Sequence, residues 1–280
     1  MKLQRAVTLL GENTRLRSLL EQRADNGDHE GLRRLAELRN PGTCHAWMWQ
    51  VSPEDGTILS DIDFSTALRH RIGACFHVDG TMCRCCGEAL DARANHALCC
   101  ASAESTVGHY GVARSLADGL RVADSSLTLE VRGLVENSRA RPADVFTQAA
   151  VPGRDAALDV TIAAQDASGA GADCCASAYR RKVQHYRSIL ASLMHSGIAF
   201  RPMVWSAEGR PHPVVRRVLG FAAELAGRRR PELSVKDFVR RWEREIAVSI
   251  QRRLARMIRA CLPKPDPRSE WLISGLRPDR

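Results

Sequence analysis

The chain has 280 residues, 44% of them hydrophobic, and a formal net charge of +9, so it can hold one sizeable core with a smaller module, or two modest domains. The positive charge favours a polyanionic partner such as DNA or RNA, with a solvated basic surface as the alternative. No apolar run reaches the ~18 residues of a membrane span, and residues 1–5 do not begin a secretory signal, so we expect an intracellular protein without a membrane partner, nuclear in a eukaryotic cell.

Residues 1–74 are predicted to form a helical segment. Leucines recur at helical spacing between residues 3 and 38, and the polar run 25–28 interrupts them, which indicates a pair of helices. A further helix is expected to begin at a cap, Ser60 or Asp61, and to continue to Ile72.

Residues 75–104 are predicted to form a small metal-binding module. Five cysteines crowd between residues 83 and 100, a pattern typical of a metal site in a reducing compartment. Three thiolates and one imidazole, a tetrahedral set suited to structural Zn²⁺, come from Cys83, Cys86, His96 and Cys100. The choice of the four ligands stays open, because Cys85 and Cys99 are adjacent to members of this set and Cys75 or His77 could replace one of them. A cluster of buried free thiols is the alternative.

Residues 105–210 have the pattern of an α/β core. A helix is expected over 106–122, and strands are expected over 127–131, 141–146, 157–162 and 198–205. Residues 174–194 have helical spacing and separate the last two strands. The predicted fold is therefore a mixed sheet flanked by helices, with the second and third strands forming an antiparallel hairpin.

Two aspartates on this hairpin are the candidate catalytic residues. Asp159 alternates with Leu158 and Val160, so its side chain is expected to point away from the core, and Asp144 lies on the neighbouring strand. Carboxylates that face the same way repel unless a cation lies between them, and Mg²⁺ prefers oxygen ligands of this kind. Lys182, on the following helix, is a candidate to orient a water molecule or to offset developing charge. One more solvated basic residue in the run 180–182 is the alternative for Lys182.

The order of these motifs resembles a known enzyme family. The motifs are Glu130, the run Arg-Pro-Ala-Asp at 141–144, the run Leu-Asp-Val-Thr at 158–161, and Lys182 with Tyr186 four residues later. They resemble the restriction-enzyme-like PD-(D/E)xK endonucleases, and more narrowly the endonuclease at the C-terminus of site-specific non-LTR retrotransposon polyproteins, which carries a cysteine-histidine knuckle just upstream. The resemblance covers residues 44–262.

The resemblance implies a restriction-endonuclease-like fold and a Mg²⁺-dependent nicking activity that leaves a 3′-hydroxyl. It implies that Asp144 and Asp159 hold Mg²⁺, that Glu130 assists, and that Lys182 acts beside the metal. Relatives often show an Arg-His pair on the helix predicted at 106–122. Gly108 replaces that arginine here, so we assign no DNA contact to His109.

Residues 211–262 are predicted to form two basic helices, over 214–226 and 235–262. Eleven basic and four acidic residues lie between 228 and 259, which holds most of the net charge. An expected phosphate-binding stripe consists of Arg252, Arg253, Arg256 and Arg259. An amphipathic helix docked on the core with solvated arginines is the alternative. Glu208, just before these helices, is expected at the surface, and residues 263–280 are expected to form an extended tail.

Two functions follow as hypotheses. The first is a Mg²⁺-dependent DNA endonuclease with a structural zinc. The second is a catalytically inactive, zinc-stabilised nucleic-acid-binding remnant, which is favoured by Ala143 between Pro142 and Asp144 and by the sequence Asp159-Val160-Thr161 where many relatives have an acid-x-Lys. The sequence defines no oligomeric state.

Overall fold

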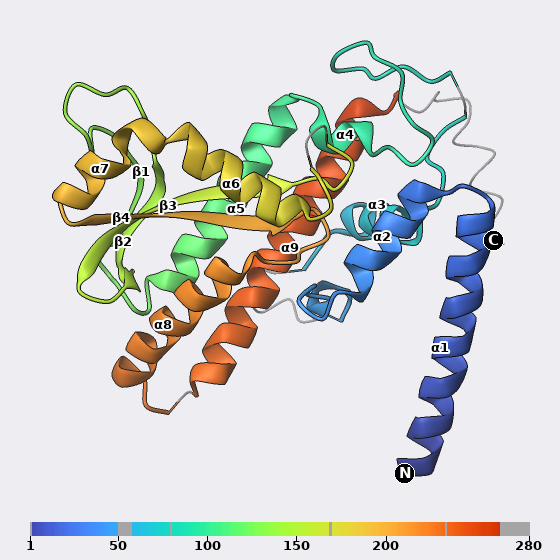
Figure 1. Ribbon diagram of the computed structural model, residues 1–280, viewed down its shortest axis with the longest axis horizontal. Helices are drawn as coiled ribbons and strands as arrows, with labels where there is room; N and C mark the ends of the chain where they lie inside the picture. The colour runs from blue at the N-terminus through green and yellow to red at the C-terminus, as the bar shows by residue number, and fades with distance from the viewer. Residues whose placement is uncertain (1, 50–57, 79, 168–169, 233, 264–280) are drawn as a thin grey trace, which may run out of the picture.

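A computed structural model describes residues 2–49, 58–78, 80–167, 170–232 and 234–263, so the predicted tail lies almost wholly outside the described residues. Within these ranges the molecule is a mixed α/β structure, as predicted: a four-stranded sheet with helices on both faces (Figure 1). None of the helices in these ranges is both long enough and apolar enough to cross a membrane.

The sheet consists of β1 (Thr128–Val131), β2 (Ala143–Val151), β3 (Arg154–Ala163) and β4 (Ile198–Ser206), in that spatial order. β1, β2 and β3 pair antiparallel, and Pro152-Gly153 forms the tight β2–β3 turn, in which glycine adopts a φ of +65°. β4 pairs parallel to β3, which requires the crossover through α6 and α7. The predicted antiparallel hairpin is confirmed.

Apolar side chains on the two faces of the sheet pack into separate cores. On one face, Leu158, Val160 and Met203 pack with α5 (Ala103–Leu120), α8 (Pro213–Arg229) and α9 (Val235–Cys261). On the other face, Val204 packs under α6 (Cys174–His185), and Ala157 and Phe200 pack under α7 (Arg187–His195). The face that alternation predicted to be polar is therefore covered as well.

The helix predicted over 174–194 is divided in two. α6 ends at His185 and α7 begins at Arg187, with Tyr186 between them at φ −94° and ψ 8°. The Tyr186 ring packs edge-on against Phe200, with ring centroids 4.9 Å apart, and its hydroxyl donates a hydrogen bond of 2.9 Å to the Arg141 carbonyl. These two contacts fix Tyr186, and with it the junction between α6 and α7, against the sheet.

The N-terminal half forms the predicted helix pair, α1 (Lys2–Asp25) and α2 (His29–Arg39). Asp28 caps α2 by accepting a 2.9 Å hydrogen bond from the Gly31 N–H. η1 (Ala46–Met48) follows, and α3 (Asp61–Ile72) is capped by Ser60, which settles the cap that the sequence left open. Residues 75–102 form the cysteine-rich segment, which contains the short α4 (His96–Cys99).

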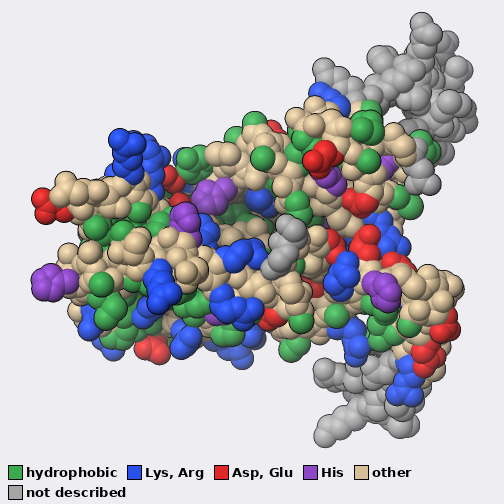
Figure 2. Space-filling view, turned by 45° about the horizontal axis from the view of Figure 1, so that its top comes forward, with side chains coloured by type: hydrophobic (Ala, Val, Ile, Leu, Met, Phe, Trp, Pro, Cys, Tyr) green, Lys and Arg blue, Asp and Glu red, His purple; other side chains and the backbone are tan. Residues whose placement is uncertain are grey.

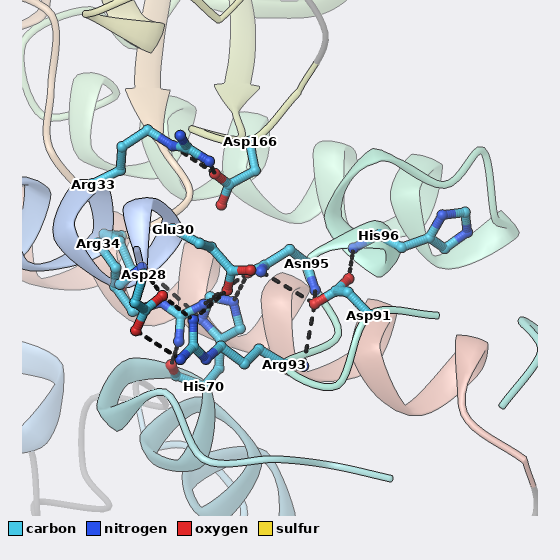
Figure 3. Close-up of polar contacts among 12 residues, drawn as sticks. Asp28, Glu30, Arg33, Arg34, His70, Asp91, Arg93, Asn95, His96 and Asp166 are labelled. Carbon is cyan, nitrogen blue, oxygen red and sulfur yellow. Dashed lines mark hydrogen bonds and ion pairs between the residues drawn. The ribbon is translucent and has the colours of Figure 1, made fainter. Parts of the chain in front are cut away.

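A buried polar cluster joins α2, α3, the cysteine-rich segment and the end of β4. Arg34 donates hydrogen bonds to the His70 carbonyl at 3.0 Å and to Asn95 Oδ1 at 2.9 Å. Nearby, Arg93 pairs with Asp28 (Figure 3). The predicted surface position of Glu208 is wrong: its side chain is 2% exposed and lies 3.4 Å from the His70 imidazole, because α3 covers it.

Candidate active site and metal centre

The two predicted aspartates lie side by side on the central strands. The Val145–Leu158 pair places Asp144 opposite Asp159, and both side chains emerge on the face that carries α6. Asp144 Oδ2 accepts a 2.7 Å hydrogen bond from the Val160 N–H, which fixes this carboxylate at the start of β2. The strand register therefore brings together two acids that are 15 residues apart in the sequence.

Lys182 completes the group from above the sheet. Its Nζ lies 3.0 Å from both carboxylate oxygens of Asp159, and it projects from the last turn of α6. The start of α6 is fixed by Asp173, whose side chain accepts hydrogen bonds from the N–H groups of Cys175 and Ala176. The lysine that the sequence placed on one helical face thus contacts the predicted acid.

Asp159 is buried, although alternation predicted an outward-facing position. It is 3% exposed because α6 covers this face of the sheet. Burial raises the pKa of Asp159 to about 6, and the negative charge of Asp144 adds to the rise, while Lys182 opposes it. Oδ2 of Asp159 is buried, and it lies 3.0 Å from the Lys182 ammonium group, so this charged contact is what compensates its burial.

His109 is a neighbour of the acids that sequence reasoning left without a role. Its Nε2 lies 3.3 Å from Asp144 Oδ2, and it projects from the second turn of α5. The family pattern pointed to this position, but the replacement of its arginine neighbour by Gly108 weakened the signal. Each aspartate therefore has its own cationic or hydrogen-bonding partner: His109 for Asp144 and Lys182 for Asp159.

Glu130 lies at the edge of the site rather than inside it. The flanking pairs Leu129–Val145 and Val131–Ala143 place it opposite Asp144, but its side chain is exposed. Its backbone has a φ of +56°, a left-handed conformation that costs about 1–3 kcal/mol for non-glycine residues and is concentrated at functional sites. No set of three acids that includes Glu130 has its oxygens within 4.8 Å of one another in the ranges that the structure describes.

Asp144, His109, Glu130 and Lys182 line an open pocket of about 340 Å³ between α5, the sheet and α6, and Asp159 lies buried next to Lys182. Arg253 forms part of its wall, is 8% exposed, and donates a 3.4 Å hydrogen bond to Ser105 Oγ. Burial lowers the pKa of Arg253 to about 10. A Cβ atom at Gly108 would lie 2.3 Å from Arg253 Cγ, so glycine at 108 is what allows this arginine of α9 to reach the pocket.

The other predicted arginines of α9 are held by protein groups. Arg259 forms a 2.6 Å ion pair with Asp63 of α3, Arg256 lies 3.9 Å from the same carboxylate, and Arg252 donates to the Ile58 carbonyl. α9 is buried along most of its length, as the docked amphipathic helix predicts. The four arginines do not form one stripe: Arg253 faces the acids, and Arg256 and Arg259 face α3.

The predicted metal ligands converge in the cysteine-rich segment. The ligand atoms of Cys83, Cys86, His96 and Cys100 lie within 4.8 Å of one another. Cys83 Sγ and Cys100 Sγ are 3.9 Å apart, and Cys86 Sγ is 3.2 Å from His96 Nε2. Two thiolates bound tetrahedrally at ~2.3 Å to one Zn²⁺ lie about 3.8 Å apart, so this group can hold a metal ion and is compatible with structural zinc.

Backbone groups prepare Cys83 for the thiolate form. Burial of the thiol opposes ionisation, but the N–H groups of Cys86 and Cys85 point at it and lower the pKa of Cys83 to about 6. Asp91 accepts hydrogen bonds from the N–H groups of Asn95 and His96, which orders the start of α4 (Figure 3). His77, an alternative ligand in the sequence, instead bonds the carbonyls of Val78 and Asp91.

Comparison with known proteins gives no relative: no family model matches the chain, and no curated protein matches it.

Proposed function

We propose that this protein is a Mg²⁺-dependent DNA endonuclease of the restriction-enzyme-like class, akin to the endonuclease region of non-LTR retrotransposon polyproteins. The observation that carries the proposal is the group formed by Asp144 and Asp159 on adjacent strands with Lys182 Nζ 3.0 Å from Asp159. Two acids on adjacent strands with a lysine beside them, next to an open pocket, are the set that metal-assisted phosphodiester hydrolysis needs.

Asp144 and Asp159 are the residues that would hold Mg²⁺. The donor set fits, because both side chains are carboxylates and the strand register places them opposite each other on adjacent strands. When bound, Mg²⁺ lowers the pKa of a coordinated water molecule and offsets charge on a phosphate oxygen.

The protein's own cations take the remaining roles. Lys182 balances the buried charge of Asp159 and presents an N–H donor beside the pocket. Arg253, held in the pocket wall by Ser105, supplies a bidentate donor for a phosphate. His109 orients Asp144 from the α5 side.

DNA is the proposed partner because basic side chains adjoin the pocket. Three exposed arginines that sequence reasoning did not single out lie in the segment between β1 and β2, the strands that carry Glu130 and Asp144: Arg132, Arg139 and Arg141. On the face shown in Figure 2, Lys and Arg side chains gather over the half of the molecule that contains the sheet, and Asp and Glu side chains are more frequent over the other half. In a eukaryotic cell, this substrate places the protein in the nucleus.

The cysteine-rich segment is proposed to hold structural Zn²⁺ through Cys83, Cys86, His96 and Cys100. A closed set of four protein ligands leaves no open position for a reaction, so this ion has a folding role. It stabilises a segment with little apolar core of its own and fixes it beside α9.

Conversion of supercoiled plasmid to nicked circles tests the proposal. The purified protein is incubated with plasmid and Mg²⁺, or with EDTA, and compared with Asp144→Ala and with Asp118→Ala, an exposed aspartate of α5 as the control. We expect nicking by the wild type and the control only with Mg²⁺, and a loss of at least about a hundredfold in Asp144→Ala. DNA binding without nicking by the wild type would support the inactive nucleic-acid-binding remnant instead.

A further inference from the structure

A second group of sulfur atoms lies against the first. The Sγ atoms of Cys83, Cys85, Cys100 and Cys261 also lie within 4.8 Å of one another. Cys261 comes from the last turn of α9, more than 150 residues after the other three in the chain. Two of the four thiols, Cys83 and Cys100, belong to both groups.

The last turn of α9 is attached to the cysteine-rich segment by three hydrogen bonds. The Arg84 N–H donates to the Cys261 carbonyl at 2.9 Å, and the Arg84 guanidinium donates to the Leu262 carbonyl at 3.4 Å. The Cys85 thiol donates to the Ala260 carbonyl at 3.4 Å. The two Arg84 bonds come from groups outside both sets of sulfur atoms, so they hold the end of α9 against residues 83–86 independently of any metal ion.

We propose that these thiols form a dinuclear Zn²⁺ site in which Cys83 and Cys100 bridge two ions. The first ion is completed by Cys86 and His96, and the second by Cys85 and Cys261. Each ion then has four ligands, which is the number that zinc takes in closed structural sites.

The spacing of the sulfur atoms suits this arrangement. The two bridging atoms, Cys83 Sγ and Cys100 Sγ, are 3.9 Å apart, close to the ~3.8 Å of thiolates that share one tetrahedral zinc. The sulfur atoms of the second group are within 4.8 Å of one another, so side-chain shifts of about 1 Å bring them to the same spacing.

Burial and charge also favour a second ion. Cys83, Cys100 and Cys261 are at most 6% exposed, so thiolates at these positions need a cation nearby. Adding Zn²⁺ together with the thiolates of Cys85 and Cys261 leaves the total charge of the site unchanged, because the two new negative charges cancel the two positive ones. By binding both Cys261 and Cys85, the second ion would also link the end of α9 to the cysteine-rich segment.

The number of zinc ions bound per chain tests the proposed dinuclear site directly. The wild type is loaded with Zn²⁺, freed of loosely bound metal by gel filtration, and analysed by native mass spectrometry and elemental analysis. We expect two zinc ions per chain in the wild type, one in Cys261→Ser, and two in Cys99→Ser, an exposed neighbouring thiol outside both groups. One zinc per chain in the wild type, or two in Cys261→Ser, overturns the proposal.

Cadmium-113 NMR of the wild type decides the matter if Cys261→Ser does not fold. Two resonances that are coupled through shared sulfur atoms are expected from a bridged pair with different ligand sets. A single resonance, or two without coupling, contradicts the bridge. Neither readout depends on nuclease activity, so the proposed function and the dinuclear site can fail separately.

Discussion

At the scale of single residues, Asp159 determines the properties of the site. Its pKa is raised by burial and by the neighbouring Asp144 and lowered by Lys182, and the result is a pKa of about 6. A carboxylate that is hard to ionise in an empty pocket is stabilised in its charged form by a bound divalent cation. Metal binding and ionisation of Asp159 are therefore coupled.

The raised pKa predicts how stability depends on pH in the absence of metal. Between about pH 4 and pH 6 the unfolded chain has lost the Asp159 proton and the folded protein keeps it, so the free energy of unfolding falls as pH rises through this range. Asp159→Asn removes the effect and is expected to stabilise the protein by up to about 3 kcal/mol at pH 7 in EDTA. Urea denaturation of both proteins at pH 4.5 and 7 measures the difference. Equal stability of the two at pH 7 would show that Asp159 ionises freely.

The sequence predicted the positions of Asp159 and Lys182, but it did not predict which side chains around them are buried. Alternation around Asp159 predicted its strand, and the helical face of Lys182 predicted its direction. Asp159 and Glu208 are buried because helices from other parts of the chain cover them. A local sequence pattern does not predict such long-range packing. The contact between His109 and Asp144 likewise appears only once α5 is placed against the sheet.

At the scale of elements, the contact between α5 and α9 positions both sides of the pocket. α5 carries His109 and α9 carries Arg253, and the two helices approach closely where Gly119 meets the Trp242 ring. The sequence predicted both helices with nearly their observed bounds. It left open whether α9 is a phosphate-binding helix or an amphipathic helix docked on the core with solvated arginines, and it did not predict that Arg256 and Arg259 have a partner on α3.

Two glycines of α5 test this packing as a matched pair. A Cβ atom at Gly119 would lie 2.7 Å from the Trp242 ring, whereas a Cβ atom at Gly111 would meet nothing within 4 Å. Gly119→Ala is expected to lower the free energy of unfolding by about 1–3 kcal/mol through overpacking. Gly111→Ala is expected to raise it by about 0.5–1 kcal/mol through helix propensity. Thermal and urea denaturation compare them, and an equal effect of both would mean that α5 and α9 are not in close contact.

At the scale of the whole molecule, α9 connects the parts of the protein. Its middle packs against the core and lines the pocket beside Asp144 and Lys182, one side pairs with α3, and its last turn contacts the cysteine-rich segment. The cysteine cluster and the acid site are thus joined by one continuous helix. We infer that metal at the cysteines stabilises the placement of Arg253 beside the acids.

The measurement that tests the central claim most directly is the single-turnover nicking rate at saturating protein, with DNA affinity measured in parallel. Asp159→Asn and Lys182→Met are compared with Asp155→Asn, which changes the same residue type near the start of β3. We predict that both site variants bind DNA like the wild type but nick at least about a hundredfold more slowly, while Asp155→Asn keeps the wild-type rate. Wild-type nicking rates in Asp159→Asn and Lys182→Met, or no Mg²⁺-dependent nicking by the wild type, would contradict the account.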